Sequence, residues 1–138
     1  MEPITPPLAL RIGPLVVHAR AAEVEAFGLA AGSGKSDKGV PFTFPVRWFT
    51  HPEIRAAGAE LVGAEPWVPI HESQSFDYDQ PLEVGVDYQM MVEIMREFEP
   101  SRLILRAEIG RMESGSPICL RAEMILRIIP TRSAESFI

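Results

Sequence analysis

The sequence has a single cysteine, three histidines and no excess of positive charge. Cys119 has no second cysteine with which to form an intramolecular disulfide, and zinc sites built on paired cysteines are excluded. With 13 Lys and Arg against 19 Asp and Glu, the net charge of −6 argues against nucleic acid or an anionic membrane as a partner. We expect neither a metal nor a bound cofactor.

Long apolar runs are also missing. No run approaches the roughly 18 residues that would span a bilayer. The N-terminus lacks the basic start and apolar stretch that are typical of a secretory signal, so we expect a cytoplasmic protein. A length of 138 residues predicts one domain, and the 46% apolar and 23% charged fractions are those of an ordinary soluble protein.

The first half of the chain predicts helices and loops. Residues 1–14 hold four of the 13 prolines and predict an extended lead-in, loosely ordered over residues 1–11. Residues 15–19 are β-prone. Residues 20–31 predict a helix, because Val24, Phe27 and Ala31 lie on one face. Pro45 suits the first turn of a central helix that begins near Phe42, and Pro52 is expected to kink or end it. Residues 53–62 predict a further helical stretch.

A polar loop, G-S-G-K-S-D-K-G over residues 32–39, separates these helices. The letters G-K-S suggest a phosphate-binding Walker motif. That motif also needs a glycine at position 29, where this chain has Leu29, and it needs to follow a strand. We therefore interpret the loop as a solvated turn.

The segment from Ile70 to Leu82 is predicted to be the strand where the helical half meets a sheet. Because side chains alternate along a strand, a regular strand separates two sets of residues. One face carries Ile70, Glu72, Gln74, Phe76 and Tyr78, and the other carries His71, Ser73, Ser75 and Asp77. The size of Phe76 and Tyr78 indicates that theirs is the core side, which turns His71 away from the core.

Three further alternating segments, near residues 87–98, 102–112 and 117–129, are joined by short turns and predict an antiparallel meander. Together with the strand near residues 67–79 they form one sheet, with the central helix across its concave face. The expected fold class is α+β in a single domain over residues 1–138. Residues 131–138 predict a loose tail.

Three stretches have an order and spacing that belong together. The strand segment fits the pattern H-x-x-Q-x-F-x-Y-x-x-P-L. The first helix ends in an A-x-G motif formed by Ala30, Ala31 and Gly32. Residues 41–45 have the sequence P-F-T-F-P. Together, over about residues 12 to 129, they resemble the MaoC-like hydratase and dehydratase family, and most closely its N-terminal dehydratase branch. The strand match consists of His71, Gln74, Phe76, Tyr78, Pro81 and Leu82.

The resemblance implies a hot-dog fold, in which an antiparallel sheet wraps around one helix, and a dimer. It implies fatty-acid metabolism, with acyl thioesters of coenzyme A or acyl carrier protein as ligands and reversible hydration of a 2-enoyl thioester as the reaction. A backbone N–H at the start of the central helix would polarise the thioester carbonyl. The candidate substrate-binding residues are Phe42, Thr43, Phe44, His71, Ser73 and Gln74.

The chain departs from the family where active members carry G-D-x-N-P-x-H after the first helix, with the aspartate and histidine as catalysts. Here the loop has Asp37 as its one carboxylate and no histidine. Asp37 and His71 are the candidate substitutes, and no confident catalytic pair can be assembled from them. His18 is expected to be a surface or strand histidine, and His51 to interact with the end of the central helix.

Three hypotheses follow. The chain is a MaoC-like protein without the usual dyad, which binds an acyl thioester or serves as the partner of a catalytic hot-dog paralogue. Alternatively, it is an active (R)-specific hydratase or dehydratase, a hydro-lyase, that uses substitute residues. In the third, it is a non-enzymatic module that binds another apolar ligand.

Overall fold

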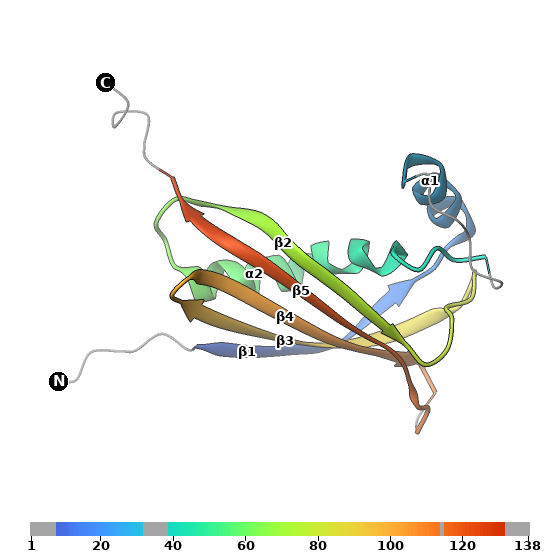
Figure 1. Cartoon of the computed structure of the whole chain (residues 1–138). Coiled ribbons are helices and arrows are strands. Elements are labelled where there is room, and N and C mark those ends of the chain that lie inside the picture. The colour runs from blue at the N-terminus through green and yellow to red at the C-terminus, as the bar shows by residue number, and fades with distance from the viewer. Residues whose placement is uncertain (1–7, 32–38, 114, 132–138) are drawn as a thin grey trace.

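The computed structural model describes residues 8–31, 39–113 and 115–131. Five antiparallel strands form one curved sheet in the order β1-β3-β4-β5-β2 (Figure 1). The strands are β1 (Ala9–His18), β2 (Trp67–Tyr78), β3 (Asp87–Phe98), β4 (Ser101–Arg111) and β5 (Ile118–Pro130). The predicted α+β class and the four predicted strands from β2 to β5 are confirmed.

Helical elements accompany this sheet, and α2 crosses its concave face (Figure 1). They are α1 (Ala21–Ala31), the 3-10 helix η1 (Phe44–Thr50) and α2 (Pro52–Val62). The central helix predicted to begin near Phe42 is a short 3-10 helix that begins at Phe44, and the break expected at Pro52 is present. His51 precedes Pro52 and is extended, with φ −54° and ψ 136°, because the proline ring disfavours a helical residue before it. The segment is therefore two short helices.

The core lies between these helices and the concave face. Phe44 is fully buried, and its ring contacts Phe27 and Trp48 edge-on at centroid distances of 5.5 and 5.9 Å. Beneath them, alternate residues of β3, β4 and β5 point inward, and Met90, Val92, Ile94, Ile109 and Leu120 have no exposed surface. Each such side chain contributes roughly 1.5–3 kcal/mol through burial.

β1 begins earlier than the sequence predicts. It pairs with β3 from Ala9 to His18, so residues 9–11 belong to the sheet and not to a loose lead-in. The register is irregular between Ile12 and Leu15. Gly13 has a φ of +128°, and a Cβ there would lie 2.6 Å from the carbonyl oxygen of Met90, so only glycine fits. This irregularity breaks the alternation and hides the strand from sequence analysis.

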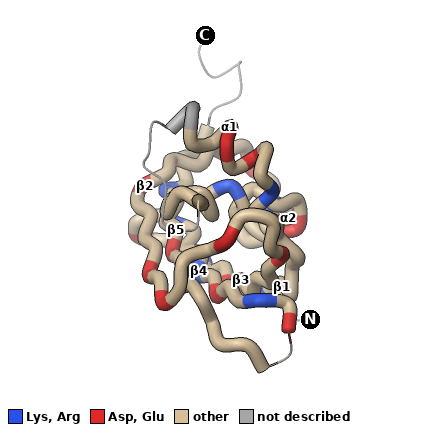
Figure 2. Tube along the Cα trace, turned by 90° about the vertical axis from the view of Figure 1, so that its right-hand side faces the viewer, with Lys and Arg blue, Asp and Glu red and all other residues tan. Residues whose placement is uncertain are grey.

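Charges of both signs are interspersed along the chain (Figure 2), and several lie on the convex face of the sheet. On that face Arg106 of β4 pairs with Glu123 of β5 at 2.8 Å, and Arg102 of β4 pairs with Glu72 of β2 at 2.7 Å. Among the described residues, no helix is long and apolar enough to cross a membrane. The predicted loop 32–38, including Asp37, and residues 132–138 of the predicted tail lie outside the described residues.

Candidate functional site

A β-bulge at Glu72 decides which side chains of β2 face the concave side. His71 pairs with Leu126 and Ser73 with Ile125, so Glu72 is an extra residue between neighbouring pairs. A bulge reverses the alternation on one side of it. As a result, His71 and Gln74 lie on the same face as Phe76 and Tyr78, and the predicted separation of His71 from these aromatic residues is wrong.

The bulge turns Glu72 outward, where two arginines from neighbouring strands hold it. Its carboxylate accepts hydrogen bonds from Arg102 at 3.1 and 2.7 Å and from Arg127 at 3.2 and 3.4 Å. Hydrogen bonds from Arg127 and Arg102 lower the pKa of Glu72. A strand without the bulge would turn this carboxylate towards the apolar concave side, which is costly for a charge.

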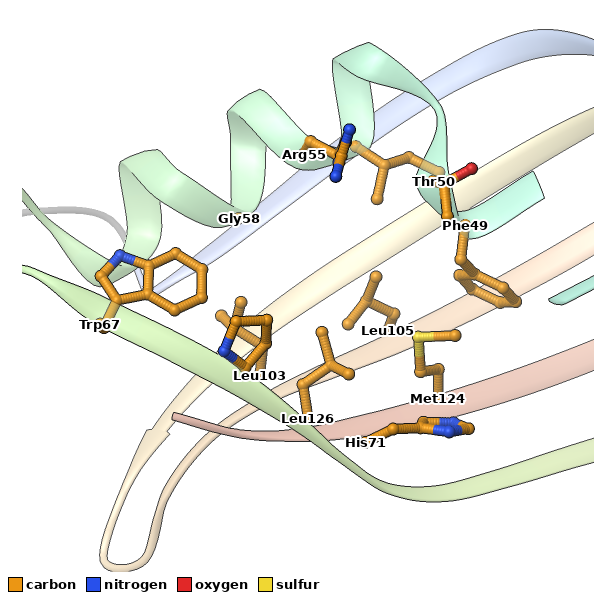
Figure 3. Close-up of a pocket in the computed structure, with 12 residues that line it drawn as sticks. Phe49, Thr50, Arg55, Gly58, Trp67, His71, Leu103, Leu105, Met124 and Leu126 are labelled. Carbon is orange, nitrogen blue, oxygen red and sulfur yellow. The ribbon is translucent and has the colours of Figure 1, made fainter. Parts of the chain in front are cut away.

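The bulge leaves the first half of β2 facing a cavity of about 460 Å³ beside α2 (Figure 3). This volume lies within the range of typical small-molecule sites. The walls come from η1 and α2 on one side and from β2, β4 and β5 on the other. The lining residues are Phe49, Thr50, Ile54, Arg55, Gly58, Trp67, Pro69, His71, Leu103, Leu105, Met124 and Leu126.

Gly58 determines how close α2 lies to the sheet at this cavity. It is buried on the inner face of the helix, and a Cβ placed there would lie 3.3 Å from Cδ1 of Leu103. Glycine costs about 1 kcal/mol relative to alanine inside a helix. A larger side chain at position 58 would extend into the cavity.

Polar groups in the cavity wall are few. Nε2 of His71 lies 3.2 Å from the amide oxygen of Gln74, so the histidine donates from Nε2, and the Gln74 amide donates to the carbonyl of Glu123 at 3.0 Å. Arg55 has no ion pair with another described residue. The described lining contains no carboxylate and no thiol, so His71 has no acidic partner there.

The second half of β2 is packed against side chains. The hydroxyl of Tyr78 donates to the carbonyl of Phe42 at 2.6 Å, and the Tyr78 ring contacts the rings of Phe42 and Phe76. Burial raises the pKa of Tyr78 well above its usual value. This half of the strand therefore closes the concave face.

Of the six substrate-binding candidates, the structure places one, His71, in the cavity wall. Gln74 accepts the hydrogen bond from Nε2 of His71. Phe42 and Thr43 are exposed before η1, Phe44 is in the core, and Ser73 faces the convex side. The predicted free amides at this helix start are partly taken: Phe44 donates to Pro41 at 3.0 Å, and Val46 donates to Thr43 at 3.1 Å.

Sequence analysis missed the remaining wall residues. Trp67 and Pro69 alternate with His71 along the strand. Because both are apolar, they indicated that the side of the strand with residue 71 faces inward. Gly58 was hidden because an isolated glycine in a helical pattern is tolerated without a site. The leucines of β4 and β5 were expected on the apolar face of the sheet, but nothing in their order along the sequence distinguishes a cavity wall from a packed core.

Solved structures share this arrangement of a sheet wrapped over short helices. The HadBC (3R)-hydroxyacyl-ACP dehydratase complex of Mycobacterium tuberculosis matches with a TM-score of 0.64 at 13% identity, over 86% of this chain and 94% of that chain. The (R)-hydratase of A. caviae matches with a TM-score of 0.59 at 18% identity, over 92% and 98%. The chain has a hot-dog fold.

Other hot-dog proteins match as well. A probable thioesterase from Bartonella henselae gives a TM-score of 0.54 at 14% identity, over 92% of this chain and 99% of that chain. No family model matches the chain, and no curated protein sequence does. At these identities the likeness shows the hot-dog fold and does not choose between its hydratase and thioesterase branches.

Proposed function

We propose that this hot-dog protein binds an acyl thioester, with the acyl chain in the cavity beside α2, and that it does not catalyse hydration by itself. The observation that carries the proposal is the cavity of about 460 Å³ with an almost wholly apolar wall. Apolar walls with a few placed polar groups are typical of sites for small apolar ligands.

The residues in the wall support binding rather than catalysis. General acid and base groups each contribute roughly 10²–10⁴-fold and must lie within hydrogen-bond reach of the reacting atoms. His71 is the one group of this kind in the described wall, and its Nε2 is taken by an amide. Since the described wall offers no carboxylate beside it, His71 lacks there the partner that a hydration reaction needs.

The named activities of the structural neighbours support a thioester as the ligand, since they are a hydroxyacyl-ACP dehydratase, a hydratase and thioesterases. We place this chain beside the MaoC-like dehydratase branch, in the cytoplasm and in fatty-acid metabolism. The proposed ligand is an acyl-CoA or an acyl carrier protein thioester.

We further propose a two-fold dimer, either of identical chains or with a catalytic hot-dog paralogue. β2 is an edge strand of the sheet, and its Val68 and Ile70 are exposed at 43% and 52%. Long exposed edges with apolar side chains are usually covered. One neighbour is itself described as a complex, HadBC. Sedimentation that gives a stable monomer at micromolar concentration would contradict the dimer.

Calorimetric titration tests the ligand. We expect saturable binding of a medium-chain acyl-CoA and at least roughly tenfold weaker binding of coenzyme A, because only the former buries an apolar chain. Equal affinity for both, or no binding of either, would overturn the thioester proposal. Binding of an alkane-chain alcohol alone would favour the module for other apolar ligands.

The position of His71 in the cavity wall favours one alternative, an active hydratase that uses His71 with Asp37. A steady-state assay with crotonyl-CoA separates the two. We expect hydration at or near background from the purified chain, unchanged in His71→Ala and Asp37→Asn. Robust activity that either substitution abolishes would establish the alternative.

A further inference from the structure

A second, smaller hollow of about 250 Å³ lies where the end of β1 and the start of α1 meet the junction of η1 and α2. Its apolar floor includes the buried Val17 and Trp48, and the Trp48 indole donates to the carbonyl of His18 at 3.2 Å. Its polar wall residues are His18, Arg20, Glu23, Arg47, Thr50 and His51. Of these residues Thr50 also lines the proposed thioester cavity, and the others do not.

The first histidine of the hollow is oriented by a carboxylate. Nδ1 of His18 lies 2.5 Å from Oδ1 of Asp87 on β3. An ionised carboxylate only accepts hydrogen bonds, so the histidine proton that faces it is on Nδ1. Nε2 has no partner among the described residues, and it becomes a second donor when the ring is protonated, with Asp87 compensating the added charge.

The second histidine is oriented in the opposite way. Nδ1 of His51 accepts a hydrogen bond from the backbone N–H of Glu53 at 3.1 Å, as the N-cap of α2. The sequence-based expectation placed His51 at the end of the central helix, whereas its ring caps the start of α2, the helix that follows. Because Nδ1 accepts, the proton of His51 is on Nε2, which is a donor without a partner among the described residues.

Two guanidinium groups complete the wall. Arg20 has no ion pair with a described residue, although the described arginines on the convex face are mostly paired. Arg47 is held over the Phe44 ring, and its nearest carboxylate contact is Glu23 at 3.8 Å. The carboxylates around the hollow are Glu23 in its wall, Asp87 behind His18, and Glu53, 4.0 Å from His51.

We propose that this hollow binds a phosphate group. Two guanidiniums supply paired donors that match phosphate geometry, His51 adds an Nε2–H donor, and His18 adds one when its ring is protonated. Thr50 does not contribute its hydroxyl proton, since it donates to the carbonyl of Arg47 at 2.6 Å. Glu23 opposes the ligand and lowers its affinity. The phosphate belongs either to a free phosphomonoester or to coenzyme A, which carries a terminal phosphomonoester.

Histidine NMR on the whole chain tests the proposal, because His71, which lines the other cavity and not this hollow, is an internal control. On titration with inorganic phosphate we expect saturable shifts of the ring signals of His18 and His51, and none of His71. In phosphate-free buffer the ring nitrogens of neutral His18 and His51 should show opposite tautomers. Shifts that are equal in all three histidines, or that do not saturate, would overturn the site.

Charge-matched variants make the test specific. Arg20→Gln should weaken phosphate binding about fivefold to tenfold, and Glu23→Gln should strengthen it several-fold. Arg55→Gln, which removes the same charge from the other cavity, should leave it unchanged. An equal loss of phosphate affinity in Arg20→Gln and Arg55→Gln would mean non-specific charge attraction and would contradict the proposal.

Comparison of coenzyme A with its dephospho form identifies the source of the phosphate. A preference for coenzyme A that Arg20→Gln abolishes assigns the site to the thioester ligand. Inorganic phosphate binding that Arg20→Gln weakens, without such a preference, assigns it to a separate phosphomonoester. Neither result depends on the acyl chain entering the cavity at Gly58, so the two proposals fail separately.

Discussion

The two halves of β2 face the same side of the sheet but have different surroundings. From Trp67 to His71 the inward side chains line the cavity, whereas from Gln74 to Tyr78 they pack against Phe42 and the core. A bulge of one residue at Glu72 separates the halves. The comparison shows that local register, and not composition alone, decides which part of a strand forms a site.

The largest expected effect compares two leucines on the inward face of β5. Leu120 lies opposite Tyr78 and is fully buried, and Leu126 lies opposite His71 and lines the cavity. Leu120→Ala should cost about 3–4 kcal/mol, and Leu126→Ala about half of that, because it removes fewer packing contacts. Urea unfolding measures both values. Equal costs would mean that the two halves are packed alike.

A smaller effect is expected from Tyr78→Phe, which removes the hydrogen bond to the Phe42 carbonyl. The loss should be about 1 kcal/mol near neutral pH. Because burial raises the pKa of Tyr78 in the folded state, the unfolded chain releases the proton first, and stability falls as the pH rises above about 10. The variant should show a flatter alkaline decline in denaturant titrations. A decline as steep as that of the parent would argue that the Tyr78 hydroxyl is not buried.

The smallest effect concerns the bulge itself. Hydrogen bonds from Arg127 and Arg102 lower the pKa of Glu72, so its contribution is present above the ordinary glutamate value and is lost as the pH falls through the folded value. Glu72→Gln should therefore lose less stability than the parent between about pH 4.5 and 3. Glu60→Gln, at an exposed position of α2, is the control. Identical acid profiles for all three proteins would exclude the ion pairs as a support of the bulge.

Most of the fold follows from the alternation of apolar residues in β3, β4 and β5 and from the resemblance at residues 71 to 82. The site follows only in part. The prediction for His71 failed on its orientation because the arginines that hold the bulge come from β4 and β5, far away in sequence. The break in the helix at His51 was predicted in part, since Pro52 was expected to kink or end the helix. No local pattern could show that Gly58 faces a cavity, because this depends on how closely α2 approaches Leu103.

The most direct measurement is calorimetric titration of one medium-chain acyl-CoA into the parent protein, Gly58→Leu and Ala59→Leu. Leucine at position 58 extends into the cavity, whereas Ala59 is exposed on the same helix. We expect Gly58→Leu to bind the acyl-CoA at least roughly tenfold more weakly, because the acyl chain can then bury a few methylenes fewer. Ala59→Leu should bind it with the affinity of the parent. Unchanged affinity in Gly58→Leu, with the fold intact by circular dichroism, would show that the acyl chain does not occupy this cavity.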